Sequence, residues 1–363
     1  MQRKPIVCPT SCKNMWIALN VCMFCSIPYR FASKKLLHKR CQSISNLVFS
    51  GGSLKGFAHL GALIELSKHY DWDTFQRQIL KISGSSAGST VAMCVAANVS
   101  LEDTLKIAMS CPVGCIVSDC PSPEVILARL MGSFRWTRER FNHPPNYDHF
   151  VWSNDGLSRY AQELCKACTG NPNTTFLELF TKTKKMLIIY ATHWRKHCAV
   201  EFSYRSFPDV EIWRAMAASM ALPLIFKPVT IHGVEYIDGG IMQNVPVSMF
   251  EPRETLYFKL VSSIEDKPAE KTDIVDYIAH IAECLFEGQE SAFLIQNPKV
   301  IEQTIFIECK GAGLLELLKP KQNYTELNNI IEQGGNSMKQ FIMVPVVLLA
   351  SYLRLTRDIR SAN

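Results

Sequence analysis

Short apolar runs alternate with helical patterns in the first part of the globular chain. Residues 47–49 and 79–83 are apolar runs that stop at glycine-containing turns, which is typical of buried strands. Residues 55–68 repeat apolar side chains at the spacing of one helix face, and residues 86–97 and 101–109 also read as helices. A strand, a turn and a helix in two successive copies predict an α/β fold. Its central sheet is expected to be largely parallel and flanked by helices.

The later chain gives a less regular pattern. We expect a central strand at residues 185–191 and a short strand at 233–238. Helical patterns occur at residues 156–168, 174–180 (with a capping signal), 210–221 and 273–288. Three parts follow from this reading: a basic, cysteine-containing N-terminal appendage (1–45), a catalytic α/β domain (46–252), and a mostly helical C-terminal extension packed on that domain (253–363).

Composition and charge narrow the choice of partners. The 363 residues are 47% hydrophobic and 20% charged, which is ample for a core and rules out a disordered chain. The net charge of +6 is concentrated partly in the first 40 residues, which suits either an anionic membrane surface or a solvated tail. The sequence has no nucleic-acid motif, so we expect no nucleic-acid partner. The apolar runs 15–27 and 341–353 are too short to span a bilayer.

The cysteines favour a reducing compartment. Most of the 14 lie singly in apolar stretches, as Cys94, Cys284 and Cys309 do, which is typical of buried thiols in a cytosolic protein. Four more lie near the N-terminus, where zinc binding, palmitoylation and unmodified thiols all fit their spacing: Cys8, Cys12, Cys22 and Cys25. We expect unmodified thiols and a cytoplasmic protein, rather than a secreted one.

A G-x-S-x-G motif lies at residues 84–88, between a predicted strand and a predicted helix. Its centre is Ser86, and the flanking Gly84 and Gly88 let the backbone turn sharply without a Cβ clash. The helix that follows directs its N-terminus at the serine, where partial positive charge favours an oxyanion. Alone, the pentapeptide also fits a turn that only caps a helix.

A second glycine-rich loop follows the first predicted strand. Such a loop presents unpaired backbone N–H groups that can hold a phosphate or an oxyanion. It matches neither a phosphate-binding loop nor a dinucleotide fingerprint, which counts against a nucleotide-binding module. The candidate oxyanion residues are Gly51, Gly52, Ser53, Leu54, Lys55 and Gly56. About 30 residues separate this loop from the serine turn, which puts both loops at the same end of adjacent parallel strands.

A third motif closes the expected strand at 233–238. Asp238 ends this strand and is followed by Gly239 and Gly240, with Asn244 and Pro246 just beyond. An aspartate before two glycines can form a turn and have no further role. Its functional interpretation depends on the other two motifs.

Together the three motifs resemble the patatin-like phospholipase family. The family pattern is a G-G-G-x-[RK]-G loop, a G-x-S-x-G nucleophile and a D-G-[GA] base, in this order. Residues 209–215, 218–223 and 234–246 add to the similarity, which covers about residues 46–250. One departure is Ser53, which replaces the third glycine of the loop. If that position needs positive φ, a serine is strained there.

The resemblance implies a three-layer acyl-hydrolase fold and a phospholipase A or lysophospholipase that acts through an acyl-serine intermediate. Ser86 would be the nucleophile and Asp238 its base, with no histidine, cofactor or metal required. Only His280 follows Asp238 in the order used by α/β-hydrolases, and we interpret it as structural. His59 is expected to pack against or orient the loop.

The expected substrate is a phospholipid or another fatty-acyl ester at a membrane surface. Apolar residues near 131–141, or either terminus, are candidates for contact with a bilayer. Three alternatives stay open: a triacylglycerol lipase, an acyltransferase on the same site, and a lipid-binding scaffold with a weakened site, for which Ser53 is the hint.

Overall fold

The computed structural model describes residues 41–110, 116, 154–223, 225–262, 297–310 and 324–343. Four regions on which the sequence made predictions lie outside these residues: the appendage before residue 41, the apolar segment 131–141, the helix at 273–288 with His280 and Cys284, and the chain beyond residue 343. Among the described residues no helix is both long enough and apolar enough to cross a bilayer.

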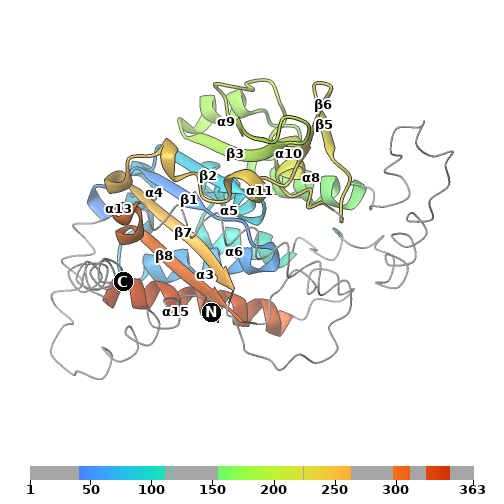
Figure 1. Cartoon of the computed structure of the whole chain (residues 1–363). Coiled ribbons are helices and arrows are strands. Elements are labelled where there is room, and N and C mark those ends of the chain that lie inside the picture. Colours follow the sequence, from blue (N-terminus) through green and yellow to red (C-terminus); the bar gives the residue numbers. More distant parts are fainter. Residues whose placement is uncertain are drawn as a thin grey trace, which may run out of the picture.

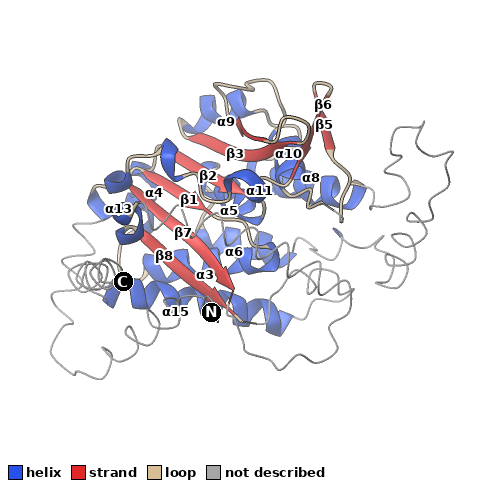
Figure 2. Cartoon of the chain, in the orientation of Figure 1, coloured by secondary structure: helices blue, strands red, loops and turns tan. Residues whose placement is uncertain are grey.

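An eight-stranded, largely parallel sheet organises the chain (Figures 1 and 2). Its strand order is β5-β6-β3-β2-β1-β7-β8, and β4 pairs with β3. The strands are β1 (Asn46–Phe49), β2 (Lys81–Ser85), β3 (Met186–His193), β4 (Cys198–Phe202), β5 (Val229–Ile231), β6 (Val234–Ile237), β7 (Thr255–Ser262) and β8 (Thr304–Cys309). Strands β3, β2, β1, β7 and β8 run parallel, whereas β4, β5 and β6 pair antiparallel.

Helices flank this sheet, as the sequence predicts (Figure 2). The α-helices are α3 (Phe57–Ser67), α4 (Trp72–Gln78), α5 (Ala87–Ala96), α6 (Leu101–Ser110), α8 (Asp155–Thr169), α9 (Phe176–Thr183), α10 (Ile212–Ser219), α11 (Gly240–Gln243), α13 (Pro298–Glu302) and α15 (Tyr324–Met343). The 3-10 helices are η2 (Ser53–Gly56), η6 (Val247–Met249) and η7 (Pro252–Glu254). The predicted cap of α9 is a capping box between Thr175 and Glu178.

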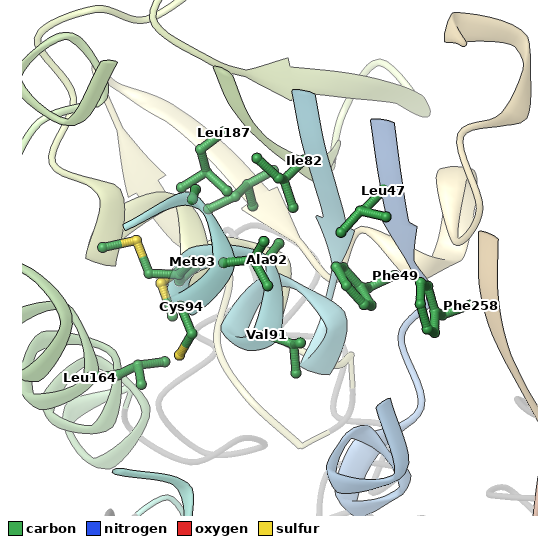
Figure 3. Close-up of a cluster of buried hydrophobic side chains, with 14 of the residues drawn as sticks. Leu47, Phe49, Ile82, Val91, Ala92, Met93, Cys94, Leu164, Leu187 and Phe258 are labelled. Carbon is green, nitrogen blue, oxygen red and sulfur yellow. The ribbon is translucent and has the colours of Figure 1, made fainter. Parts of the chain in front are cut away.

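Alternate residues of the central strands enter two apolar clusters, one on each face of the sheet. On one face Leu47, Ile82 and Leu187 pack with α5 and α8, as Figure 3 shows. On the other face Val48 and Ile188 pack with the segment around η6 and with α13. Because both faces are covered, strands such as β1 read as continuous apolar runs instead of alternating patterns.

The described residues of the C-terminal part of the chain include two strands as well as helices α13 and α15. Strand β7 pairs in parallel with β1, and β8 pairs with β7, so both belong to the central sheet. Helix α15 packs along α3. At Gly334 an added Cβ would lie 1.9 Å from the Ala58 carbonyl oxygen, so the two helix backbones are in direct contact. The three-part division of the chain stays a prediction.

Candidate active site

Ser86 and Asp238 meet at the carboxyl end of the parallel strands. The Ser86 hydroxyl donates a hydrogen bond of 2.7 Å to Asp238 Oδ2, across 152 residues of sequence. Ser86 directly follows β2, and Asp238 directly follows β6. Strand β3 lies between these two strands and pairs with both. The sheet order therefore brings the two predicted residues together.

The backbone at Ser86 makes the sharp turn that the motif predicts. Ser86 has φ 49° and ψ −127°, a conformation that costs a residue with a Cβ on the order of 1–3 kcal/mol. The flanking glycines are required by close approach. A Cβ on Gly84 would lie 2.4 Å from the Gly88 carbonyl oxygen, and one on Gly88 would lie 2.3 Å from that of Phe49. Helix α5 thus begins directly against the end of β1.

Asp238 is buried and titrates near neutrality. Burial raises the pKa of its carboxyl from 3.8 to about 7, although hydrogen bonds from the Ser86 hydroxyl and the Gly240 N–H lower it. The Gly240 N–H donates to Oδ1 over 2.7 Å. Gly239 is fixed by close approach, because an added Cβ would lie 2.0 Å from the Tyr190 carbonyl oxygen. The carboxyl therefore keeps one oxygen for Ser86, and its pKa suits a base at neutral pH.

A third residue, Ser219, holds both loops. Its buried hydroxyl accepts from the Ser86 N–H over 2.8 Å and donates to the Tyr190 carbonyl over 2.6 Å. The Gly239 N–H donates to the Ser219 carbonyl, and the Asp238 N–H donates to the carbonyl of Ala221. Residues 218–223 contribute to the family resemblance, but the sequence assigns no role to Ser219. The available signal was a serine at the end of an apolar helix shortly before a proline.

The glycine-rich loop packs against the serine turn. A Cβ on Gly51 would lie 2.8 Å from Ser86 Cβ, and one on Gly56 would lie 2.9 Å from Ala87 Cβ. The Gly51 N–H donates to Asn244 Oδ1 over 2.6 Å, so it is already paired. Asn244, which follows the base motif, is a second residue whose role the sequence did not reveal.

Six loop residues are candidates for the oxyanion hole, but fewer than six of their backbone N–H groups are unpaired. The Lys55 N–H donates to the Gly52 carbonyl over 3.0 Å. The first N–H groups of a helix have no acceptor inside it, and in η2 these belong to Ser53 and Leu54, next to Gly52. Ser53 has φ 53°. The position at which the family has glycine therefore adopts a positive φ in this chain.

His59 is hydrogen-bonded to Ser50, the residue directly before the loop. It is fully buried, and its Nε2 lies 2.9 Å from the Ser50 carbonyl oxygen, so Nε2 carries the hydrogen. Burial lowers the pKa of the imidazole to about 4, which keeps it neutral at physiological pH. Its ring packs edge-on against Phe49 and Phe258. His59 therefore packs beside the start of the loop and is hydrogen-bonded to the residue before it, as the sequence predicts.

Comparisons with known proteins agree with this fold and identify the family. The family model "Patatin-like phospholipase" matches residues 47–251, more than half of the chain. An uncharacterized protein of Acanthamoeba polyphaga mimivirus is 28% identical over 208 residues, 57% of this chain and 62% of that protein. "Probable lipid hydrolase 463L" of Invertebrate iridescent virus 6 is 26% identical over 225 residues, 61% of this chain and 66% of that protein. The matches thus span less than two thirds of these relatives.

The fold has a counterpart among solved structures. VipD from Legionella pneumophila superposes with a TM-score of 0.52 at 17% identity, covering 83% of this chain and 67% of that chain. The chain belongs to the patatin-like phospholipase family.

Proposed function

We propose that this chain is a lipid acyl-ester hydrolase, of phospholipase A or lysophospholipase type, with Ser86 as nucleophile and Asp238 as base. The observation that carries the proposal is the 2.7 Å hydrogen bond from the Ser86 hydroxyl to the buried Asp238 carboxylate. The family and the lipid-hydrolase relative support the substrate class.

The reaction follows from this contact. As Ser86 Oγ attacks the ester carbonyl carbon, its proton passes to Asp238 Oδ2. The tetrahedral intermediate collapses, the ester C–O bond breaks, and Asp238 returns the proton to the departing alcohol. Water then attacks the acyl-serine with Asp238 again as base, which releases the fatty acid and restores Ser86.

The oxyanion is assigned to the N–H groups of Gly52, Ser53 and Leu54. The N–H groups of Gly51 and Lys55 are paired within the protein, and Gly56 is the last residue of η2, not one of its first. Each such donor contributes about 3 kcal/mol to transition-state stabilisation in comparable sites. Every step uses groups of the protein, and we propose that the reaction proceeds with EDTA present.

We further infer that the carboxyl end of the parallel strands, where Ser86 and Asp238 lie, faces a lipid surface. The β3–β4 turn extends past Thr192, whose hydroxyl donates to the Asp238 carbonyl over 2.8 Å. At its tip Trp194 is 37% exposed, and Lys196 is exposed beside it, as is Arg195, which forms an ion pair of 3.2 Å with Glu235. An indole with adjacent cations suits the headgroup region of an anionic bilayer. Buried thiols such as Cys41 and Cys309 support the cytoplasmic side.

The test is fatty-acid release from mixed phospholipid and lysophospholipid vesicles with EDTA present. Wild type should be active, whereas Ser86→Ala and Asp238→Asn should be inactive while keeping the circular dichroism and melting behaviour of folded protein. Inert wild-type protein on phospholipid, lysophospholipid and triacylglycerol would overturn the proposal. A fluorophosphonate probe that labels wild type but not Ser86→Ala would identify the nucleophile independently of the substrate.

A further inference from the structure

Two thiols outside the active site lie against each other. Cys94 Sγ and Cys168 Sγ are 3.6 Å apart, although 74 residues separate them in the sequence. Cys94 is on α5 and Cys168 is near the end of α8. In Figure 3 the Cys94 side chain extends from α5 toward Leu164 of α8. Because a disulfide needs about 2.05 Å between the sulfurs, an approach of about 1.5 Å completes the bond.

The two thiols differ in exposure. Cys94 is only 4% exposed, whereas Cys168 is partly exposed, so a soluble oxidant reaches Cys168 first and Cys94 second. Cys165 lies one turn earlier on α8 and is fully buried. Its thiol donates to the Asn171 carbonyl over 3.6 Å, and burial raises its pKa to about 11. Cys165 is therefore a matched thiol on the same helix that should not react.

We propose that Cys94 and Cys168 form a thiol–disulfide site that takes a low-molecular-weight disulfide as its oxidant. The Cys168 thiolate attacks one sulfur of the oxidant, breaks its S–S bond and releases one thiolate. The Cys94 thiolate then displaces the second thiolate from the mixed disulfide. The protein loses two hydrogens in total, and the oxidant is reduced to two thiols. A reductant reverses both steps.

The cross-link would join two helices that support the active site. Helix α5 follows Ser86 directly, and α8 packs against α10, which ends at Ser219. A bond between residues 94 and 168 closes a long loop and so restricts the unfolded chain. The oxidised protein should therefore melt at a higher temperature than the reduced protein. Bonds of this kind in a reducing compartment are reversible and respond to redox state.

The experiment uses the full chain equilibrated with oxidised glutathione, after which free thiols are blocked and the protein is digested without reductant. We expect a peptide pair that links Cys94 to Cys168 and that disappears after reduction. The melting temperature should rise by about 2–10 °C on oxidation of wild type. Cys165→Ala should keep both the linked pair and the rise, whereas Cys168→Ala should lose both.

Three results would overturn the proposal. The first is that both thiols remain fully alkylatable after equilibration. The second is that Cys168 stops at a mixed disulfide with glutathione. The third is that Cys168→Ala gains the same thermal stability on oxidation as wild type. The linkage map of wild type and the behaviour of Cys168→Ala decide between these outcomes without any substitution of the buried Cys94, and neither measurement depends on hydrolytic activity.

Discussion

The backbone N–H of Ser86 is held by the hydroxyl of Ser219 at 2.8 Å. The same hydroxyl donates to the Tyr190 carbonyl, so the nucleophile turn is fastened to the central strand through one side chain. Because Ser86 sits at φ 49°, its backbone needs such an external support to hold the conformation. Because Ser219 is fully buried, we interpret it as a positioning residue that acts on the geometry of Ser86.

Ser219→Ala should lower kcat about 10- to 100-fold and leave KM nearly unchanged, because it leaves a buried N–H and a buried carbonyl unpaired at a cost of about 1–3 kcal/mol. Steady-state hydrolysis, measured where the variant is still folded, checks this. Ser83→Ala is the matched control, since Ser83 is equally buried and its hydroxyl has no partner among the described residues. Wild-type kcat in Ser219→Ala would contradict the positioning role.

In the proposed reaction, the pKa of Asp238 sets the pH dependence of the rate. The carboxyl must be ionised to accept the Ser86 proton, and burial raises its pKa to about 7. We expect kcat/KM to rise about tenfold per pH unit below this value and to level off above it. His59 is neutral throughout this range, because its pKa is lowered to about 4. A rate that is flat between about pH 5 and 8 would exclude Asp238 as the base.

The same shift makes an opposite prediction for stability. Between the unfolded pKa of 3.8 and the folded value of about 7, the folded protein keeps a proton that the unfolded chain has lost. Stability from this group is therefore present at low pH and lost as the pH rises, by up to about 4 kcal/mol. Asp238→Asn cannot titrate, so its free energy of unfolding should rise relative to wild type between about pH 4 and pH 8.

Urea unfolding of both proteins across this range measures the difference, and Ser86→Ala serves as the control. That variant keeps Asp238 and should therefore still lose stability as the pH rises. Its pH dependence should extend to higher pH than in wild type, because the Ser86 hydrogen bond that lowers the Asp238 pKa is gone. A constant difference between Asp238→Asn and wild type would mean that the carboxyl titrates at its ordinary pKa.

Much of the site could be predicted because its signals are local. The glycines around Ser86 and the Asp238 turn are close in sequence to the strands that carry them. The spacing between the 51–56 loop and the serine turn marks two adjacent parallel strands, β1 and β2. The roles of Ser219 and Asn244 could not be predicted in this way. Each depends on a contact with a residue more than 130 positions away, and a buried serine or an asparagine after a turn has no distinctive pattern.

The same reasoning explains the strands that the sequence did not reveal. Strand β7 includes the buried Lys259, which interrupts its apolar run. Strand β8 is a short apolar run, and such a run fits a strand or a helix segment equally well. The partner of β7 is β1, about 200 residues earlier, so the pairing is not visible in any local window.

The lipid surface proposed for the β3–β4 turn predicts a local effect on membrane binding. Trp194→Ala combined with Lys196→Ala should weaken binding to vesicles rich in anionic phospholipid about tenfold, because both an interfacial indole and a cation are lost. The matched control is Leu80→Ala with Lys81→Ala. Leu80 is 56% exposed and directly precedes β2. It therefore lies at the amino ends of the parallel strands, opposite the end that carries Ser86. Equal loss of binding in the two double variants would contradict the placement.

Helix α15 should be needed for the loop on which hydrolysis depends, although it lies beyond the matched family region. It packs along α3, which begins directly after the loop at Gly56. A Cβ at Gly334 would lie 1.9 Å from the Ala58 carbonyl oxygen, and no side-chain rotation relieves a clash with backbone. Gly334→Ala must therefore push α15 away from α3.

We expect Gly334→Ala to lose at least about 2 kcal/mol of stability, as overpacked cores do, and to lower kcat through displacement of α3. Gly335→Ala is the control on the next residue of the same helix, where the added Cβ stays 3.5 Å from its nearest contact. It should gain up to about 1 kcal/mol from better helix propensity and keep wild-type turnover. Urea midpoints and kcat for the pair check this. Similar stability in the two variants would show that α15 can move away from α3 without cost and that the loop does not depend on it.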